Sequence, residues 1–401
     1  MMKQLQTNPP AKILVLPSWY PSQVDAYAGD FIKRHVQAIA LLKSQYVIYV
    51  VKDEEGKITL NEKSTVNEYH GYTEKIIYYH VKTTGIPIVD RFLSFKKYNQ
   101  IYKKAIRQYI AEKGKPNLIH VHVALKAGIL ALWAKNKWNI PFILTEHWTV
   151  YLPEANLRVE HLPLFFRHML QKILKQTAAF TVVSNWLGKA VQKKFFFVKY
   201  TVIPNVVDHS IFFPLPNQHS QKVKFIHAST MNYQKNTEDI IRAFQILKIN
   251  DCNAELNLFG PVQPVIQNLI NELQLDKHVF LKGEVSQQIL ATEMQQSDAL
   301  VLYSRFETFG CVIIEALATG IPVIVSDIPV FSELVTENEN GLFVKGNDSK
   351  ALAKKLMEFI INKKIYDTQL IQKSTEKYSY AAVGKQFALL YNQICNSTTY
   401  R

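Results

Sequence analysis

The stretch SRFETFGCVIIEALATGIPVIVSD, Ser304 to Asp327, places two carboxylates, Glu307 and Glu315, eight positions apart. Glu307 lies in the turn after a predicted strand, and Glu315 lies on the helix that follows. Gly310 stands near the start of this helix, where free backbone N–H groups and the positive end of the dipole attract an anion. Amides suit a phosphate and carboxylates suit hydroxyl groups, so the stretch predicts a site for a phosphorylated, polyhydroxylated ligand. Taken alone, the same residues also fit ordinary turn glycines and a solvated helix glutamate.

Short apolar runs alternate with helical patterns on both sides of this stretch. In the first half, the predicted strands include KILVLP (12–17), YVIYVV (46–51), NLIHVHV (117–123), PFILTEH (141–147) and AAFTVVS (178–184). The pattern restarts at VKFIHAS (223–229) and continues through ELNLFG (255–260), HVFLKG (278–283), ALVLYS (299–304) and PVIVS (322–326). Such alternation predicts parallel sheets with helices on both faces. We therefore expect an α/β protein with two Rossmann-like domains that face each other across a ligand-binding cleft.

The domain boundaries follow from a polar stretch that contains two prolines. We expect an N-terminal domain at 1–205, a linker or hinge at 206–221 and a C-terminal domain at 222–378. Residues 379–401 are predicted to form a helix that crosses back to the first domain. Residues 53–90 are expected to be irregular, with β-like pieces such as KIIYYHV (75–81).

The composition is that of a folded globular protein. The chain has 401 residues, 48% of them hydrophobic and 20% charged, which excludes a largely disordered chain. The three cysteines, Cys252, Cys311 and Cys395, show no metal-ligand spacing and no disulfide framework, which favours a reducing compartment. No apolar run is long enough for a signal-peptide core or a transmembrane helix, so we expect a cytoplasmic protein.

Positive charge is concentrated in the first half of the chain. The formal net charge is +14, and residues 1–210 hold 29 Lys and Arg against 14 Asp and Glu, whereas 211–401 hold 18 against 19. Basic residues gather at Arg91–Arg107 and Lys189–Lys199, with aromatic residues among them. This asymmetry predicts a polyanionic partner, either nucleic acid or an anionic membrane surface, unless it is only a solvated basic surface.

The order of motifs resembles that of the retaining GT-B glycosyltransferases of family four, whose Glu-x7-Glu signature matches the spacing of Glu307 and Glu315. The resemblance extends over nearly the whole chain: SWYPSQVDAYAGDF with Gly29, NLIHVH with His120 and His122, ILTEHW with His147, VVSNWL, IPNVVD, and HASTMNYQKN with Lys235. It implies the GT-B fold, with the acceptor bound by the first domain and the donor by the second. It also implies transfer from a nucleotide-sugar with retention, by same-face attack in which the leaving diphosphate assists deprotonation of the acceptor.

The resemblance implies a role for each matching residue. The catalytic residues would be His147, which faces the donor sugar, Glu307, which contacts it, and Lys235, which neutralises the diphosphate. The donor-binding residues would be Glu315 for the ribose hydroxyls, the amides of Thr308, Phe309 and Gly310, Lys282 and Gly283 near the base, and Arg305 and Ser229 beside the diphosphate. Gly29, Asp30, His120 and His122 would form the acceptor or phosphate loop. A fixed cation needs no metal, so we expect no metal and no cofactor, with a UDP- or GDP-sugar as co-substrate.

The chain departs from the family pattern in three places. Many members carry an arginine six positions before the lysine, where this chain has Ser229. A second diphosphate cation is therefore missing or is supplied by Arg305 or Lys282. The first loop has a single glycine after alanine, and the hinge reads NVVD where a glycine is frequent, which we expect to change local geometry only.

The histidines have more than one interpretation. His120 and His122 could be metal ligands, but no third or fourth ligand is evident, which favours hydrogen-bonding roles in a loop near the cleft. His147 could be a buried structural histidine, although its motif favours a place in the cleft. Glu146 points away from the cleft if the strand runs through both residues, and could be a cleft carboxylate if the strand ends first.

Other functions fit the sequence less well. A dinucleotide-dependent oxidoreductase needs G-x-G-x-x-G after the first strand, and LPSWYPSQVDAYAGD lacks it. A nucleic-acid binder would explain the charge, but no helix-turn-helix, zinc or RNP-type motif is visible. The alternative that stays open is a non-catalytic sugar-nucleotide or glycan-binding protein on the same scaffold, although Glu307, Glu315 and Lys235 are all present.

The basic first half fits an acceptor that lies on an anionic bilayer, where each Lys or Arg adds about 1 kcal/mol of attraction. We therefore expect a glycan or lipid-linked acceptor and peripheral association with the inner face of the cell membrane through Arg91–Arg107 and Lys189–Lys199. We expect no nucleic-acid partner. The resemblance implies a place in bacterial cell-surface polysaccharide or lipopolysaccharide assembly.

Overall fold

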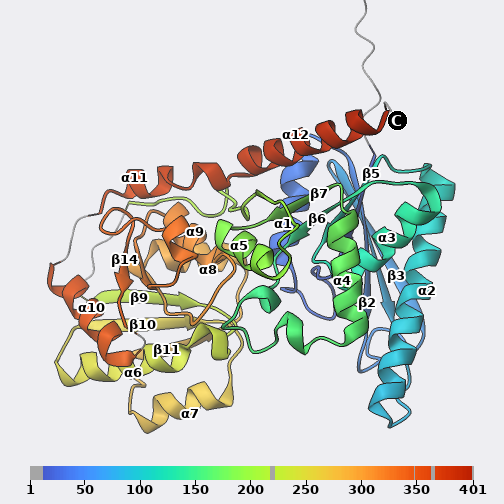
Figure 1. Ribbon diagram of the computed structural model, residues 1–401. Helices are drawn as coiled ribbons and strands as arrows, with labels where there is room; N and C mark the ends of the chain where they lie inside the picture. The colour runs from blue at the N-terminus through green and yellow to red at the C-terminus, as the bar shows by residue number, and fades with distance from the viewer. Residues whose placement is uncertain (1–11, 217–221, 347, 363–365, 400–401) are drawn as a thin grey trace, which may run out of the picture.

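A computed structural model describes residues 12–216, 222–346, 348–362 and 366–399, and Figure 1 shows two α/β halves side by side. The first half is built on a sheet in the order β3-β4-β2-β1-β5-β6-β7-β8. Its strands are β1 (Ile13–Pro17), β2 (Gln45–Lys52), β3 (Glu62–Tyr69), β4 (Tyr72–Tyr79), β5 (Leu118–His122), β6 (Phe142–Glu146), β7 (Ala179–Val182) and β8 (Thr201–Val202). Neighbouring strands run parallel, except for the antiparallel pair of β3 and β4.

Helices cover both faces of this sheet because its central strands are apolar on both sides. The helices are α1 (Asp30–Ala40), α2 (Pro87–Lys113), α3 (Ala127–Trp138), α4 (Leu164–Gln176) and α5 (Asn185–Lys194). Along β1, Leu14 and Leu16 join the cluster that contains the buried residues of α2 and α3. The alternate residues Ile13 and Val15 join a second cluster with α1. This two-sided burial fixes the strand at the centre of the domain.

The second half is built on a parallel sheet in the order β11-β10-β9-β12-β13-β14. Its strands are β9 (Val223–Ala228), β10 (Ala254–Phe259), β11 (Val279–Gly283), β12 (Ala299–Leu302), β13 (Val323–Ser326) and β14 (Gly341–Val344). Its helices are α6 (Thr237–Ile249), α7 (Pro264–Glu272), α8 (Gln287–Gln295), α9 (Cys311–Ala318) and α10 (Ser349–Asn362). Short 3-10 turns are η1 (Thr149–Tyr151), η2 (Val159–His161), η3 (Tyr233–Lys235), η4 (Phe331–Glu333) and η5 (Glu376–Tyr378). The expectation of two Rossmann-like domains is confirmed.

The C-terminal helices α11 (Thr368–Lys373) and α12 (Tyr380–Thr399) run along one side of both halves, with α12 over α1 (Figure 1). Gly384 allows α12 to approach α1 closely, since a Cβ there would lie 2.2 Å from the carbonyl oxygen of Ala38. The Tyr391 hydroxyl lies 2.6 Å from Nδ1 of His120, beneath α12. The last helix of the chain therefore packs on the first domain. Of the predicted linker, residues 217–221 lie outside the described residues.

The region 53–90 is more regular than the sequence predicts. Strand β3 pairs along its full length with β4 at the edge of the first sheet. Seven of its eight residues are exposed, so the segment has no apolar alternation that would mark it as a strand. Its strand conformation depends on pairing with β4, whose residues are mostly buried.

Candidate functional site

A cleft of about 310 Å³ lies where the carboxyl ends of the two sheets meet. The first domain contributes Trp19, Phe31 and His147 to its walls, and His147 follows directly after β6. The second domain contributes Lys235 and the segment from Glu307 to Val312, which runs from the loop after β12 into the first turn of α9. The predicted catalytic residues His147, Glu307 and Lys235 are thus brought together in one cavity.

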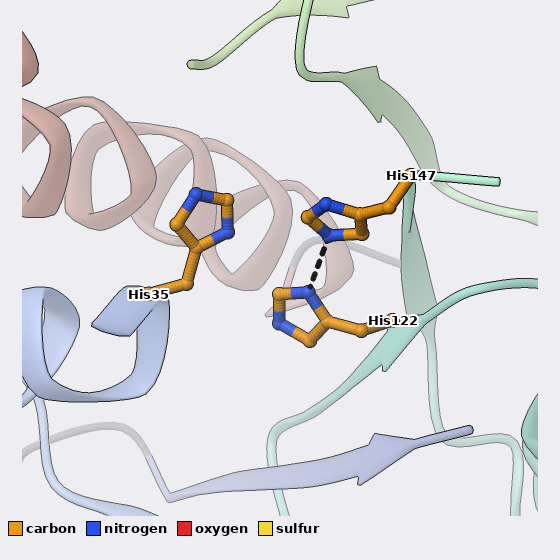
Figure 2. A group of neighbouring side chains, drawn as sticks. All are labelled: His35, His122 and His147. Atoms are coloured by element: carbon orange, nitrogen blue, oxygen red, sulfur yellow. Dashed lines mark hydrogen bonds between the residues drawn. The ribbon is translucent and has the colours of Figure 1, made fainter. Parts of the chain in front are cut away.

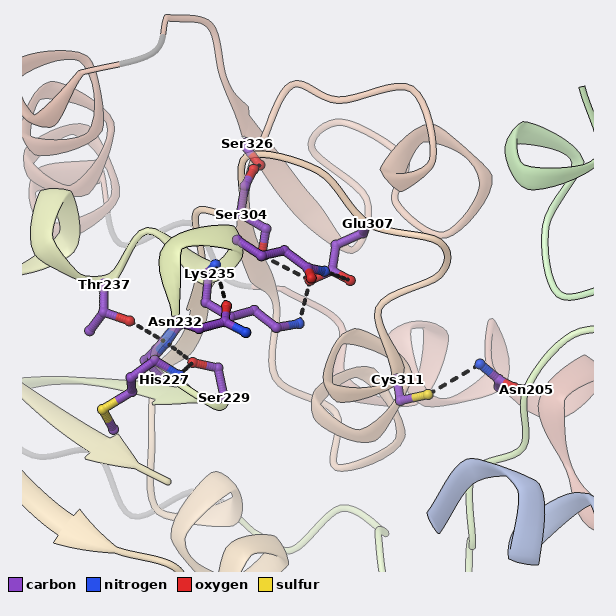
Figure 3. Close-up of polar contacts among 12 residues, drawn as sticks. Asn205, His227, Ser229, Asn232, Lys235, Thr237, Ser304, Glu307, Cys311 and Ser326 are labelled. Carbon is purple, nitrogen blue, oxygen red and sulfur yellow. Dashed lines mark hydrogen bonds and ion pairs between the residues drawn. The ribbon is translucent and has the colours of Figure 1, made fainter. Parts of the chain in front are cut away.

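Lys235 and Glu307 form an ion pair in this cleft, as Figure 3 shows. The Lys235 side chain is 18% exposed and that of Glu307 is 7% exposed, so the pair is largely desolvated. Glu307 also accepts from Ser304 Oγ at 3.0 Å and from Gln234 Nε2 at 3.0 Å. These hydrogen bonds fix the carboxylate, and the lysine places a cation beside the start of α9.

Glu315 lies on α9 and is held by a cation from the other domain. Arg34 of α1 places Nη1 2.6 Å from Glu315 Oε1 and Nη2 2.8 Å from Asp30 Oδ2, and both Arg34 and Glu315 are buried. Asp30 also accepts from Gln287 Nε2 across the cleft at 2.9 Å. Burial acts to lower the pKa of Arg34, but the two carboxylates outweigh it, so the pKa lies above its ordinary value.

The start of α9 has the geometry expected of an anion-binding helix terminus. Gly310 is the N-cap with φ 104°, a conformation that favours glycine, and it lines the cleft with Thr308 and Phe309. The carbonyl of Thr308 accepts from Ser184 Oγ at 2.7 Å, and Asn205 Nδ2 lies 3.3 Å from Cys311 Sγ. Two hydrogen bonds from the first domain therefore hold the start of α9, and Figure 3 shows the one between Asn205 and Cys311.

Five of the eight predicted donor-binding residues lie outside the lining of this cavity, among them the buried Glu315. Ser229 accepts from the amide of Met231 and bonds His227 Nε2 at 2.7 Å, so its hydroxyl is engaged in the turn after β9. The Arg305 guanidinium stacks on the ring of Tyr233 at 4.3 Å and donates to its carbonyl. Lys282 and Gly283 end β11, where Lys282 is exposed. Neither Arg305 nor Lys282 therefore replaces the missing second cation in this arrangement.

Gly29 and Asp30 form the start of α1. Gly29 is left-handed, with φ 67°, and a Cβ there would lie 2.6 Å from the backbone of Trp19. Because any side chain at this position would clash with Trp19, the turn before α1 requires a glycine here. Asp30 is committed to Arg34 and Gln287, so in this arrangement it links the two domains.

Three buried histidines, His35, His122 and His147, surround one point beside the cleft (Figure 2). Their ring centroids are 5.4 to 5.6 Å apart, and His122 Nδ1 lies 3.2 Å from His147 Nε2. Burial lowers the pKa of His35 to about 4, and burial with neighbouring imidazoles lowers the pKa of His122 and His147 well below the usual value. Neutral imidazoles can ligate a transition metal, and one ring nitrogen of each histidine lies within 4.8 Å of one nitrogen of each of the other two. His35 supplies the third ring that the sequence did not reveal.

His120 has the hydrogen-bonding role that the sequence favours, and it is not free to bind a ligand. Its Nδ1 bonds the Tyr391 hydroxyl and its Nε2 bonds Thr145 Oγ1 at 2.7 Å, so partners within the chain occupy both nitrogens. His122 is also buried, but within the described part of the chain its Nε2 has no partner.

Glu146 is a structural carboxylate. It is fully buried and accepts from the amides of Ala124, His147 and Trp148 and from the hydroxyl of Tyr151. Burial raises its pKa, although these four hydrogen bonds act in the opposite direction. Its carboxylate therefore holds the turn that presents His147.

Arg34 and His35 are the site residues that sequence reasoning missed. Both lie on the buried face of α1, and a charged residue on such a face is a signal because Arg is rarely buried without a partner. One partner of Arg34 can be predicted, because Asp30 lies four residues earlier and therefore on the same face of the helix. The second partner, Glu315, comes from the other domain and has no signal in the sequence.

Two Rossmann-like domains around a cleft that is lined by Glu307, with Glu315 buried on the adjoining helix α9, define a GT-B glycosyltransferase. Residues 64–211 match the family model described as Glycosyltransferase Family 4, and 211–377 match the model of glycosyl transferases group 1. The chain belongs to the family-four, group 1 glycosyltransferases.

Three known proteins illustrate the similarity. An uncharacterized glycosyltransferase of Methanocaldococcus jannaschii is 28% identical over 82% of this chain and 90% of its own length. The alpha-monoglucosyldiacylglycerol synthase of Acholeplasma laidlawii is 25% identical over 71% of this chain and 78% of its own length. The structure of sucrose-phosphate synthase from Thermosynechococcus elongatus superposes with a TM-score of 0.74 at 19% identity, over 96% of this chain and the whole of that one, which shows the fold alone.

Proposed function

We propose that this chain is a retaining glycosyltransferase that moves a sugar from a UDP- or GDP-sugar to a glycan or lipid-linked acceptor. The observation that carries the proposal is the cleft in which Lys235 and Glu307 face the glycine-capped start of α9. A diphosphate would be held by the Lys235 ammonium and the amides at this helix terminus, which stabilise the charge that develops as it leaves. The ribose would be held by Glu315.

Same-face attack suits the state of the two carboxylates. Glu307 is paired with Lys235 and Glu315 with Arg34, so neither is placed as an attacking nucleophile. In the proposed reaction, the acceptor hydroxyl attacks the anomeric carbon from the side on which the diphosphate leaves, and the diphosphate takes the proton. The neutral His147 ring, whose Nδ1 has no partner among the described residues, would hydrogen-bond a donor-sugar hydroxyl. The fixed cation supports chemistry that needs no metal.

The test of this function is calorimetric titration of the pure protein with UDP, GDP and ADP in buffer containing EDTA. We expect micromolar binding of one nucleotide, because the site supplies a cation, helix amides and a carboxylate. Binding that appears only after Mg²⁺ or Zn²⁺ is added would contradict a metal-independent site. Absence of binding to all three nucleotides, with and without metal, would favour the alternative of a non-catalytic scaffold.

We propose that the enzyme acts at an anionic membrane surface in cell-surface polysaccharide or lipopolysaccharide assembly. Ile86, Ile88 and Phe92, at the start of α2, are 58%, 78% and 64% exposed, and Arg91 is exposed among them. Exposed apolar groups beside cations suit the interface of a bilayer with anionic headgroups. The similarity to a synthase of a glucosylated diacylglycerol supports a lipid acceptor.

The aromatic residues of α2 contribute less to this surface than the sequence suggested. Tyr98 and Tyr102 are buried, and the Tyr102 hydroxyl donates to the carbonyl of Ile48 at 2.7 Å. Only the first turns of the helix present apolar side chains outward. None of the described helices is long and apolar enough to span a membrane.

We expect the chain to sediment with vesicles of phosphatidylglycerol and phosphatidylcholine more strongly than with pure phosphatidylcholine. Replacing both Ile88 and Phe92 by serine should weaken this binding about tenfold or more, because two apolar side chains that insert into the bilayer interface are removed. The matched control replaces Ile249 and Val265, which are 71% and 58% exposed on the other domain, by serine. Equal binding to both vesicle types, or equal loss in the control, would refute this surface.

A further inference from the structure

A large basic groove lies between α4 and α5 of the first domain, apart from the donor cleft. Its volume is about 1080 Å³. Six cations line it against one carboxylate, that of Glu160: Arg158, Arg167, Lys175, Lys189, Lys193 and Lys194. Of these, Lys194 is paired with Glu160. The donor site uses none of these residues, so their concentration in one hollow calls for an anionic ligand of its own.

The inner end of the groove is joined to the reaction site. Trp186 and Ala190 line the groove and pack against the small cluster of Leu152, Ala155 and Phe306, and Phe306 is the residue before Glu307. Tyr151, also in the lining, donates to Glu146, the residue before His147. A ligand that fills the groove therefore ends beside the two loops that carry the catalytic candidates.

The outer end of the groove is apolar. Leu164 and Phe196 line it and are 73% and 91% exposed, and the neighbouring Phe165 is 53% exposed. Phe165 contacts Phe95 of α2, with ring centroids 6.1 Å apart. This apolar rim thus leads from the basic groove towards the start of α2, where Phe92 and Ile88 are exposed.

We propose that this groove binds the phosphate or diphosphate of a lipid-linked acceptor, with the lipid chain leaving over Leu164, Phe165 and Phe196. The inference rests on the proposed function and names the acceptor class. Arg167, Lys189 and Lys193 supply the charge that a phosphate requires, and the apolar rim supplies a path for a hydrocarbon chain. The glycan end of such a molecule then points towards the cleft, where its hydroxyl meets the donor sugar. The bound phosphate belongs to the acceptor and not to a bilayer headgroup.

The test uses farnesyl diphosphate as the probe, titrated into the full chain in the absence of vesicles. Replacing Lys189 and Lys193 by glutamine should weaken binding about tenfold or more, because two cations near the phosphates are lost. The matched control replaces Lys172 and Lys199, which are exposed outside the groove lining, by glutamine with the same change of charge. Farnesol and inorganic pyrophosphate serve as probes for the lipid and phosphate parts alone.

Each outcome separates this inference from the proposed function. Loss in the groove variant, with retention in the control and in the double variant Lys235→Met with Glu307→Gln, supports the groove. Unchanged binding in the groove variant, equal loss in the control, or loss in the folded double variant overturns it, since the last result would place the probe in the donor cleft. Anionic vesicles should bind the groove variant and the control equally, and a larger loss for the groove variant would assign the groove to headgroups. The titrations with UDP, GDP and ADP test the donor cleft, so their outcome does not depend on these measurements of the groove.

Discussion

The Lys235→Ala variant should lose about 10²- to 10³-fold in turnover, because the leaving diphosphate loses the one fixed cation that lines the described cleft. Nucleotide binding should weaken as well. Removal of the lysine leaves Glu307 buried without its partner, which should cost about 3–5 kcal/mol of folding stability. The measurements are sugar transfer or slow donor hydrolysis, nucleotide calorimetry and thermal unfolding.

A double variant separates the effect of Lys235 on folding stability from its effect on turnover. The double variant Lys235→Met with Glu307→Gln removes both charges, so it should recover most of the unfolding temperature but none of the turnover. Lys277→Ala, which removes an exposed lysine of the same domain, is the matched control and should change neither. Turnover that returns together with stability in the double variant would show that Lys235 acts only by balancing the charge of Glu307.

The sequence predicts those parts of the fold whose side chains are buried in a periodic pattern. The central strands of both sheets are apolar on both faces, and all of them lie where the apolar runs predict. Strand β3 escapes prediction because it is exposed and depends on its partner strand. The aromatic residues of α2 were interpreted as a surface feature, yet Tyr98 and Tyr102 face the sheet, since a basic helix can still bury one aromatic stripe.

The residues of the site also fall into two groups, those that local sequence motifs predict and those that only the tertiary structure brings together. The positions of Glu307, Glu315 and Lys235 come from local motifs, and the meeting of Lys235 with Glu307 in one cleft follows from β9 and β12 being neighbours in the second sheet. Contacts between domains have no local signature. The pairing of Arg34 with Glu315 and the third ring of the histidine group depend on how α1 faces the second domain and β6, which only the tertiary structure reveals.

Arg34→Lys should raise the KM for the nucleotide-sugar about tenfold while lowering kcat less than about threefold. Arg34 holds Glu315 Oε1 and Asp30 with one planar guanidinium, and a lysine ammonium cannot match both carboxylates in this fork. Glu315 would then receive the ribose hydroxyls from a less fixed position, which weakens donor binding more than the chemical step. The lysine preserves the charge, so stability should fall by only about 1–3 kcal/mol.

The control for this change is Arg242→Lys, a conservative replacement of an exposed arginine on α6. It should leave KM, kcat and unfolding temperature unchanged. Because the Arg34 bond joins α1 to α9, its weakening should also let the domains open, which small-angle scattering would detect as a larger radius of gyration without donor. A lower unfolding temperature with an unchanged KM would show that Arg34 only ties the domains together. A raised KM that saturating donor overcomes would show that it positions Glu315 for the ribose.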